Sequence, residues 1–134
     1  MKKIIIGSLA LLVLAATFQS ATQKDGGAIT KEDGMTVVNT TELGQDVIGY
    51  VATTPLKIYI QKNKVVKVEA LKNQETPKYM AMVKKKLLSA WNDKKVSEAA
   101  TMKVDAVTGA TFTSEAVIKN VQRGLEYYQK NGKK

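Results

Sequence analysis

The sequence predicts an α+β fold in which a small, mostly antiparallel β-sheet packs against two helices. Apolar and polar side chains alternate on both sides of a short polar break within residues 56–68, which is typical of a β-hairpin. Apolar residues then recur at helical spacing in two later segments, which begin near residues 77 and 114. The length of 134 residues indicates one domain with a modest core.

Residues 1–21 predict a secretory signal peptide. Two lysines precede an apolar run at positions 4–16, and small or polar residues follow it. This run is shorter than the roughly 20 apolar residues of a membrane-spanning helix. Gln19 stands where a small residue is usual before cleavage after Ala21, so an uncleaved signal anchor is the alternative. We expect an extracytoplasmic protein, in the periplasm or at the cell surface, that meets the membrane peripherally or through this anchor.

The segment at residues 22–44 predicts a linker. It is rich in Gly, Thr, Asp and Lys and shows no sustained apolar period, apart from a short strand at Met35–Val38. The domain proper is expected at 45–134. Its first strand is predicted at 46–52, where a Thr-Thr-Pro sequence ends it.

The remaining elements follow from periodicity. Strands are expected at 56–60 and 65–68, joined by a turn in which Asn63 can adopt a positive φ. Pro77 is typical of a first helical residue. The apolar stripe of this helix is Met80, Val83, Leu87 and Trp91. A second helix is predicted from Ser114 to Gln129, and its stripe is Val117, Val121, Leu125 and Tyr128.

The chain contains neither histidine nor cysteine. Disulfides, thiolate nucleophiles, His-assisted serine hydrolases and Cys/His zinc sites are therefore excluded. The usual ligands of haem and iron–sulfur clusters are also absent. Carboxylates are few and scattered, so the sequence predicts no metal site. A chemically demanding reaction would therefore require a bound cofactor.

The formal net charge is +9, and Arg123 is the only arginine among 21 basic residues. Base readout and bidentate phosphate recognition favour arginine, and no nucleic-acid-binding motif is present. We therefore expect no nucleic-acid partner. Lysines of an exported protein are more typical of solubility or of contact with anionic envelope surfaces.

Hydroxyl groups surround a glycine in the segment before the second predicted helix. Thr108, Thr111, Thr113 and Ser114 flank Gly109 there. Free N–H groups and the positive end of the helix dipole would hold a phosphate at this position. The alternative interpretation is structural, with Thr113 or Ser114 as the N-cap and Gly109 in a turn.

The full string Asp105-Ala-Val-Thr-Gly-Ala-Thr111, followed by Phe-Thr-Ser and an amphipathic helix, resembles the flavinylation motif of the FMN-binding domain family. That family includes covalently flavinylated subunits of the Na⁺-translocating NADH:quinone reductase and of the Rnf complex, and small secreted flavoproteins. Gly49-Tyr50, the hairpin and Glu75-Thr76-Pro77 also match. The resemblance therefore extends from about Gly49 to Tyr128.

The resemblance implies an exported electron-transfer flavoprotein whose FMN is attached by a phosphoester to Thr111, with Thr113 as the second choice. It also implies two kinds of partner: a separate, magnesium-dependent flavin transferase that uses FAD, and redox proteins in the envelope. Residues of the transferase recognition sequence would be Asp105, Gly109 and Ala110. Hydrogen bonds to the phosphate or ribityl chain would come from Thr108 and Thr113. The loop near the flavin ring would contain Glu75 and Thr76.

One position departs from the family pattern. Lys78 follows Glu-Thr-Pro where glycine is common, and it would set a positive charge near the flavin that favours anionic reduced states. Tyr79, Trp91 and the Met80/Met82 pair are expected to pack in the core or on a helix face rather than to stack on a flavin. Two alternative functions remain, a non-redox module that docks anionic envelope components and a small FMN-dependent reductase. No acid/base pair is evident, which favours a carrier over a complete enzyme.

Overall fold

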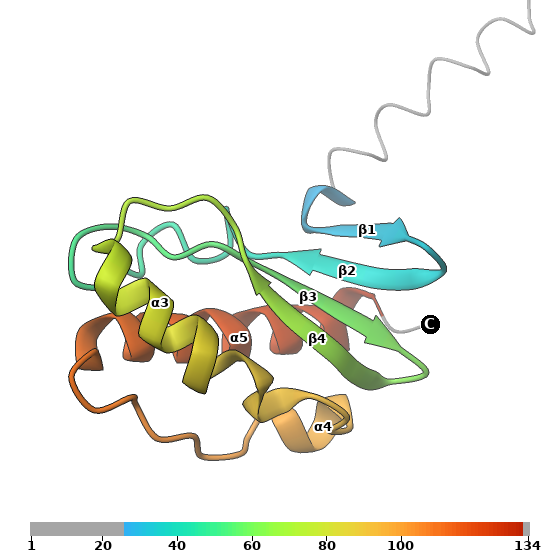
Figure 1. The fold of residues 1–134 in the computed structure, drawn as a ribbon. Helices are drawn as coiled ribbons and strands as arrows, with labels where there is room; N and C mark the ends of the chain where they lie inside the picture. Colours follow the sequence, from blue (N-terminus) through green and yellow to red (C-terminus); the bar gives the residue numbers. More distant parts are fainter. Residues whose placement is uncertain (1–25, 133–134) are drawn as a thin grey trace, which may run out of the picture.

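The computed structural model describes residues 26–132, and the predicted signal segment at 1–21 lies outside them. Within this range the fold is α+β, as predicted (Figure 1). The antiparallel sheet has the order β1 (Ile29–Glu32), β2 (Met35–Asn39), β3 (Leu56–Gln61) and β4 (Lys64–Ala70). The helices are α3 (Pro77–Lys86), α4 (Val96–Ala99) and α5 (Thr111–Asn131), with 3₁₀ turns η1 (Gly26–Ala28) and η2 (Leu88–Trp91). No helix in this part of the chain is long and apolar enough to cross a membrane.

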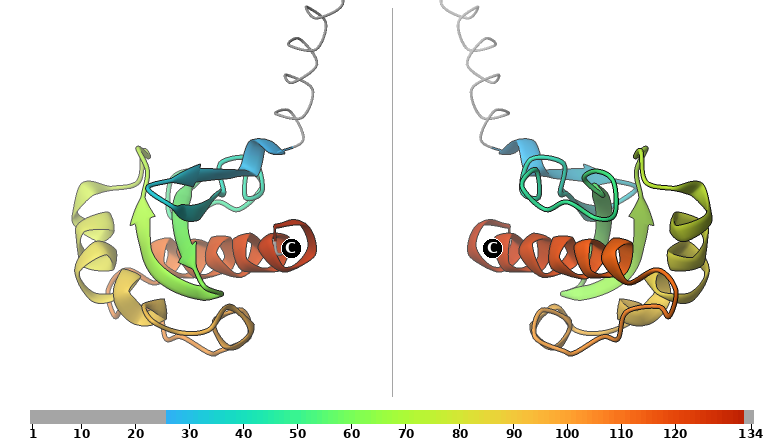
Figure 2. Two further views of the ribbon diagram at one scale, coloured as in Figure 1. Left: turned by 90° about the vertical axis from the view of Figure 1, so that its right-hand side faces the viewer. Right: turned by 90° about the vertical axis from the view of Figure 1, so that its left-hand side faces the viewer.

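The core lies between the sheet and α5, which contacts β2 and β3 (Figure 1). Figure 2 shows α3 on the β4 side of the sheet and the β1–β2 hairpin on the other side. The residues of both predicted stripes are buried in one cluster with side chains of β3. The first helix is shorter than its stripe, because α3 ends at Lys86 and Trp91 belongs to η2. Residues of this core with at most 1% exposure include Ile58, Ile60, Val83, Trp91, Val117, Val121 and Leu125.

The predicted β3–β4 hairpin is confirmed, and its two-residue turn has positive φ at both Lys62 (52°) and Asn63 (62°). Two consecutive left-handed residues are the signature of a type I′ turn, whose twist matches the flanking strands. The Asn63 carbonyl also accepts a hydrogen bond from Val96 N at 2.9 Å, which ties the turn to the start of α4.

The prediction of a linker at 22–44 is wrong for its described part, although the short strand expected at Met35–Val38 is present as β2. β1 and β2 pair with each other through a turn at Asp33 (φ 50°) and Gly34 (φ 81°), and β2 pairs with β3. Val37 and Val38 are completely buried. Asp-Gly between two β-capable segments is a strong hairpin signal, and polar residues around it obscured the pattern.

The predicted strand at 46–52 is also wrong. The segment is irregular, with one isolated bridge between Ile48 and Thr53 and a tight turn closed by Gly49 N and Ala52 O at 2.8 Å. The N–H groups of its last three residues, 50–52, bond to the side chain of Glu75 in place of a neighbouring strand.

The loop before β3 is held against α5 by the single arginine. Arg123 Nη1 donates to Leu43 O at 2.9 Å and to Asp46 Oδ1 at 2.5 Å. Arg123 Nη2 donates to Asp46 Oδ2 at 3.1 Å. The hydrogen bond from Arg123 lowers the pKa of Asp46 from its ordinary value. The geometry is the bidentate arginine–carboxylate fork, so this arginine has a structural role.

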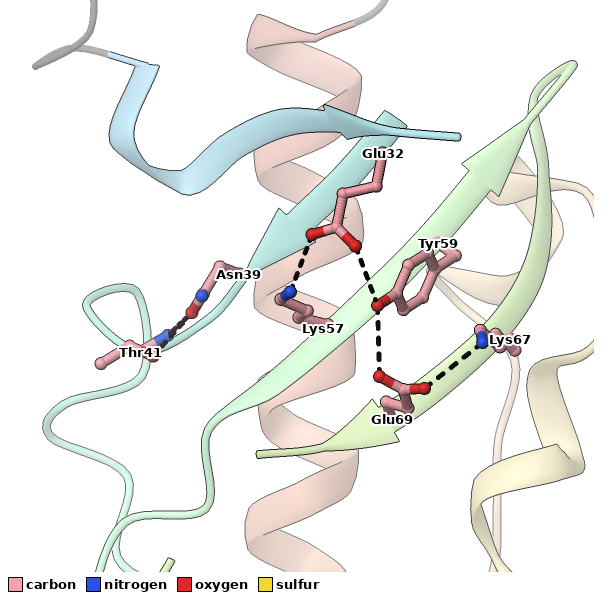
Figure 3. Close-up of polar contacts among 7 residues, drawn as sticks. All are labelled: Glu32, Asn39, Thr41, Lys57, Tyr59, Lys67 and Glu69. Atoms are coloured by element: carbon pink, nitrogen blue, oxygen red, sulfur yellow. Dashed lines mark hydrogen bonds and ion pairs between the residues drawn. The ribbon is translucent and has the colours of Figure 1, made fainter. Parts of the chain in front are cut away.

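The outer face of the sheet carries a polar network (Figure 3). Lys57 Nζ lies 2.7 Å from Glu32 Oε2, and this hydrogen bond lowers the pKa of Glu32. The Tyr59 hydroxyl lies 3.3 Å from Glu32 Oε1 and 3.2 Å from Glu69 Oε1, and Lys67 pairs with Glu69 at 3.3 Å. Exposed pairs of this kind add little stability, but they keep this face of the sheet polar.

Candidate functional site

A surface cavity of about 270 Å³ lies at the N-terminal end of α5. Its lining comes from three segments that are distant in the sequence. Tyr50 belongs to the loop before β3, Tyr79 to α3, and residues 109–113 to the turn before α5 and its first residues. These segments meet at the left of Figure 1. The cavity is therefore a product of the tertiary fold.

One side of the cavity is an aromatic wall, formed by Tyr50, Tyr79 and Phe112. Tyr50 meets Tyr79 edge-on, with ring centroids 5.1 Å apart at 88°. It lies nearly parallel to Phe112, at 6.3 Å and 23°. Tyr50 is 55% and Phe112 63% exposed, and the neighbouring Ile48 and Val51 are also exposed. Clustered exposed apolar side chains of this kind mark a binding surface.

The other side of the cavity is the first turn of α5. This helix begins at Thr111, three residues before the predicted Ser114, and Ala110 is its N-cap without a side-chain capping bond. Its first helical hydrogen bond runs from Ser114 N to Ala110 O at 2.9 Å. The N–H groups of residues 111–113 precede that bond, so they and the helix dipole favour an anion here.

Gly109 shapes the turn that leads into α5. Its φ is +92°, and Ala110 N donates to Val107 O at 2.9 Å across the turn. Glycine is the default residue for such a left-handed position. Ser114 fixes the turn from the helix side, because its buried Oγ accepts a hydrogen bond from Val107 N at 3.0 Å. Ser114 is thus not the N-cap that one interpretation of the sequence gave.

The two threonines of the first turn have different surroundings. Thr111 is exposed and lines the cavity. Thr113 is only 1% exposed, and its Oγ1 donates a 2.5 Å hydrogen bond to Glu75 Oε1. The Thr111 hydroxyl is therefore accessible to a reactant, whereas the Thr113 hydroxyl is buried and already bonded.

Glu75 connects the two sides of the site. Its carboxylate also accepts hydrogen bonds from three consecutive N–H groups of the loop, Tyr50 at 2.8 Å, Val51 at 2.6 Å and Ala52 at 2.7 Å. Burial opposes ionisation, but the bonds from Thr113 and these backbone groups outweigh it and lower the pKa of Glu75 below its ordinary value. Gly49 makes room, since a Cβ there would lie 2.6 Å from Glu75 Oε1.

A family model described as an FMN-binding domain matches residues 49–126. The chain belongs to the FMN-binding domain family. The comparisons with curated proteins and with solved structures found no match. The matched range contains every residue that lines the cavity, from Tyr50 to Thr113, whereas β1 and β2 lie before it.

The residues of this FMN-binding domain fit the three chemical parts of FMN. The aromatic wall offers ring faces and edges for an isoalloxazine ring. Thr111 offers a hydroxyl for a polar chain, and the N–H groups that open α5 suit a phosphate. Bound flavin would supply electron or hydride transfer, chemistry that the side chains of this chain lack.

The site residues predicted from the sequence fall into three groups. Lining the cavity are Gly109, Ala110, Thr111 and Thr113. Glu75 lies behind Thr113, and Thr76 is the N-cap of α3. Outside the lining, on exposed positions, are Asp105, Thr108 and Lys78. Within residues 26–132 no group of three carboxylates is placed to hold a metal ion.

Sequence reasoning missed the aromatic wall of the FMN-binding domain. Tyr79 was expected only to pack on a helix face, yet it lines the cavity, whereas Trp91 and Met80 are core residues as predicted. Phe112 is exposed next to the buried Thr113, off the apolar stripe of α5, whereas Tyr79 is half-buried and packs against the core. A large aromatic residue off the stripe and next to a predicted motif was the available signal.

Proposed function

We propose that this FMN-binding domain carries FMN covalently, through a phosphoester to Thr111, and works as an exported electron carrier. Attachment at Thr111 is supported most directly by the contrast between the two threonine hydroxyls in the first turn of α5. Thr111 is exposed at the cavity, whereas Thr113 is 1% exposed and donates to Glu75. Of the two candidate acceptors, only the first is free to react without breaking a buried hydrogen bond.

The attachment is a phosphoryl transfer from FAD, made by a separate magnesium-dependent flavin transferase. Thr111 Oγ1 attacks the phosphorus on the FMN side of the pyrophosphate, and the bond to the bridging oxygen breaks. AMP leaves, and the hydroxyl proton passes to a base of the transferase. No redox change occurs. Asp105 is exposed six residues before Thr111, which supports its role in recognition by the transferase.

Two features favour a carrier over a small reductase. The lining offers aromatic rings and hydroxyl groups that suit a flavin, and it contains no carboxylate or lysine. The cavity also adjoins the exposed side chains of Ile48 and Val51, so a redox partner protein can approach it across an apolar rim. The signal-like pattern at residues 1–21 supports export, where a covalent tether prevents loss of the flavin.

Flavin fluorescence in a denaturing gel tests the proposal after co-expression with a flavin transferase. The wild-type band should fluoresce, and Thr111→Ala should reduce the signal to background. Thr101→Ala is the matched control, since it removes an exposed threonine outside the motif and should keep most of the fluorescence. An undiminished signal in Thr111→Ala, or a non-fluorescent wild-type band, would overturn the covalent assignment.

A further inference from the structure

A second cavity, of about 290 Å³, lies between the β3–β4 turn and the start of α4. Asn63 and Ser97 line it together with three lysines: Lys62, Lys64 and Lys95. We name these three residues the lysine cluster. The ion pairs within residues 26–132 include none of them, because they involve Lys57, Lys67 and Arg123.

The backbone fixes the walls of this cavity. Val65 N donates to Lys94 O at 2.9 Å, and Val96 N donates to Asn63 O at 2.9 Å. The Tyr128 hydroxyl donates to Asn63 Oδ1 at 3.0 Å, which fixes the turn to α5. These hydrogen bonds hold the two backbone segments that carry the lysine cluster next to each other.

Two members of the cluster form an unfavourable pair. Lys64 and Lys95 are directly opposite each other in an isolated antiparallel bridge. Residues opposite in such a bridge have their side chains on the same face a few ångströms apart, and like charges there repel. The neighbouring Asp93 is exposed and takes part in no ion pair in this part of the chain. A bound anion would turn this repulsion into attraction.

The position of the lysine cluster in the fold bears on which kind of anion it binds. Gln129 lines the same cavity, and it lies 18 residues along α5 from Thr111, or about 27 Å at 1.5 Å per residue. A Cβ on Gly132 would lie 2.8 Å from Ile29 Cδ1, so β1 also begins at this end of α5 (Figures 1 and 2). The chain that leads into β1 carries the apolar run at positions 4–16.

We propose that the lysine cluster binds the phosphate headgroups of anionic phospholipids. It would dock the domain on a membrane surface with the flavin cavity at the far end, open to redox partners. Each lysine near an anionic surface adds to the attraction, and the lysine ammonium is suited to a diffuse layer of phosphates. This binding does not depend on flavin, so it stands or fails separately from the covalent attachment.

Lysine acetylation footprinting of the full chain tests the proposal with a readout at each residue. The probes are vesicles of phosphatidylcholine with about one third phosphatidylglycerol, vesicles of phosphatidylcholine alone, and inorganic phosphate at the same phosphate concentration. The acetylation rates of Lys62, Lys64 and Lys95 should fall several-fold with the anionic vesicles only. The exposed Lys78, at the flavin end of the fold, should be unaffected. Protection by all three probes, by none, or equally at Lys78 would overturn the lipid assignment.

Substitution of the cluster gives a second test. Replacing all three lysines with Gln should lower the affinity for the anionic vesicles by roughly 10- to 100-fold relative to neutral vesicles at low salt. The control variant replaces the exposed residues Lys72, Lys78 and Lys103 with Gln and should retain the lipid preference. The single change Lys95→Glu should weaken the preference and also raise the thermal midpoint, because it places opposite charges across the bridge. An unchanged lipid preference in either cluster variant, or a lowered midpoint in Lys95→Glu, would contradict the proposal.

Discussion

Glu75 is a buried carboxylate whose four hydrogen bonds come from both sides of the flavin cavity. The resemblance to the family implied that the loop with Glu75 lies near the flavin ring; in the structure this side chain lies behind Thr113, outside the cavity lining. Its bonds hold the loop that carries Tyr50 against the first turn of α5. The side chain therefore positions the aromatic wall relative to Thr111.

Replacing Glu75 with Gln should destabilise the fold by about 2–4 kcal/mol. A glutamine amide has one acceptor oxygen, so its NH₂ group would face donors that the carboxylate now satisfies. Chemical unfolding with urea measures the difference. The control is Glu98→Gln, an exposed change that should alter the free energy of unfolding by less than about 0.5 kcal/mol. Equal stabilities of the two variants would refute this role.

The lowered pKa of Glu75 predicts that the protein becomes less stable in acid. The pKa of Glu75 is lowered in the folded state, so its contribution to stability is complete above the unfolded value of 4.5 and is lost as the pH falls through the lower folded value. The free energy of unfolding of the wild type should therefore decrease as the pH falls from 6 to 3. Glu75→Gln should show a smaller decrease, since Glu32 and Asp46 titrate in both proteins. Parallel curves would contradict the prediction.

At the scale of elements, the sequence predicted the strands and helices that have a regular apolar period. The β3–β4 hairpin and the helix from Pro77 follow from alternation and helical stripes, and both are confirmed. The irregular loop at 46–52 could not be predicted, because the partners of its N–H groups belong to Glu75, far along the chain. The aromatic wall was missed for the same reason, since Tyr50, Tyr79 and Phe112 meet only in the folded protein.

The β1–β2 hairpin should be required for folding, although it precedes the range that the family model matches. Val38 is fully buried and faces the core near Gly124 of α5. Val38→Ala should cost about 2 kcal/mol through lost burial and a residual cavity. Thr30→Ala, at an exposed position of β1, is the control and should be nearly neutral. Thermal unfolding compares them, and a neutral Val38→Ala would indicate that the hairpin is dispensable.

At the scale of the whole molecule, α5 separates two sites. The cavity proposed for FMN lies at its first turn, and the lysine cluster lies beside its last turns. The chain as a whole carries a formal net charge of +9. Charge of this size attracts anionic partners over about a Debye length, so it acts on encounter rates more than on the fold.

Reduction of the flavinylated protein by a small anionic reductant should therefore slow as salt increases. We expect the second-order rate constant for dithionite to fall several-fold between 10 mM and 0.5 M salt, since screening removes the attraction. Stopped-flow absorbance of the flavin measures this rate. A neutral reductant is the control and should show little dependence on salt. An increase of the dithionite rate with salt would mean that the flavin end is electronegative despite the net charge.

Peptide mass spectrometry tests the proposed covalent bond at Thr111 most directly. Cleavage after Lys103 and Lys119 releases one peptide, Val104–Lys119, that contains every candidate hydroxyl of the motif. After co-expression with a flavin transferase and denaturation, this peptide should gain the mass of FMN minus water, and fragment ions should place that mass on Thr111. An unmodified peptide, or the added mass on Thr108, Thr113 or Ser114, would contradict the assignment.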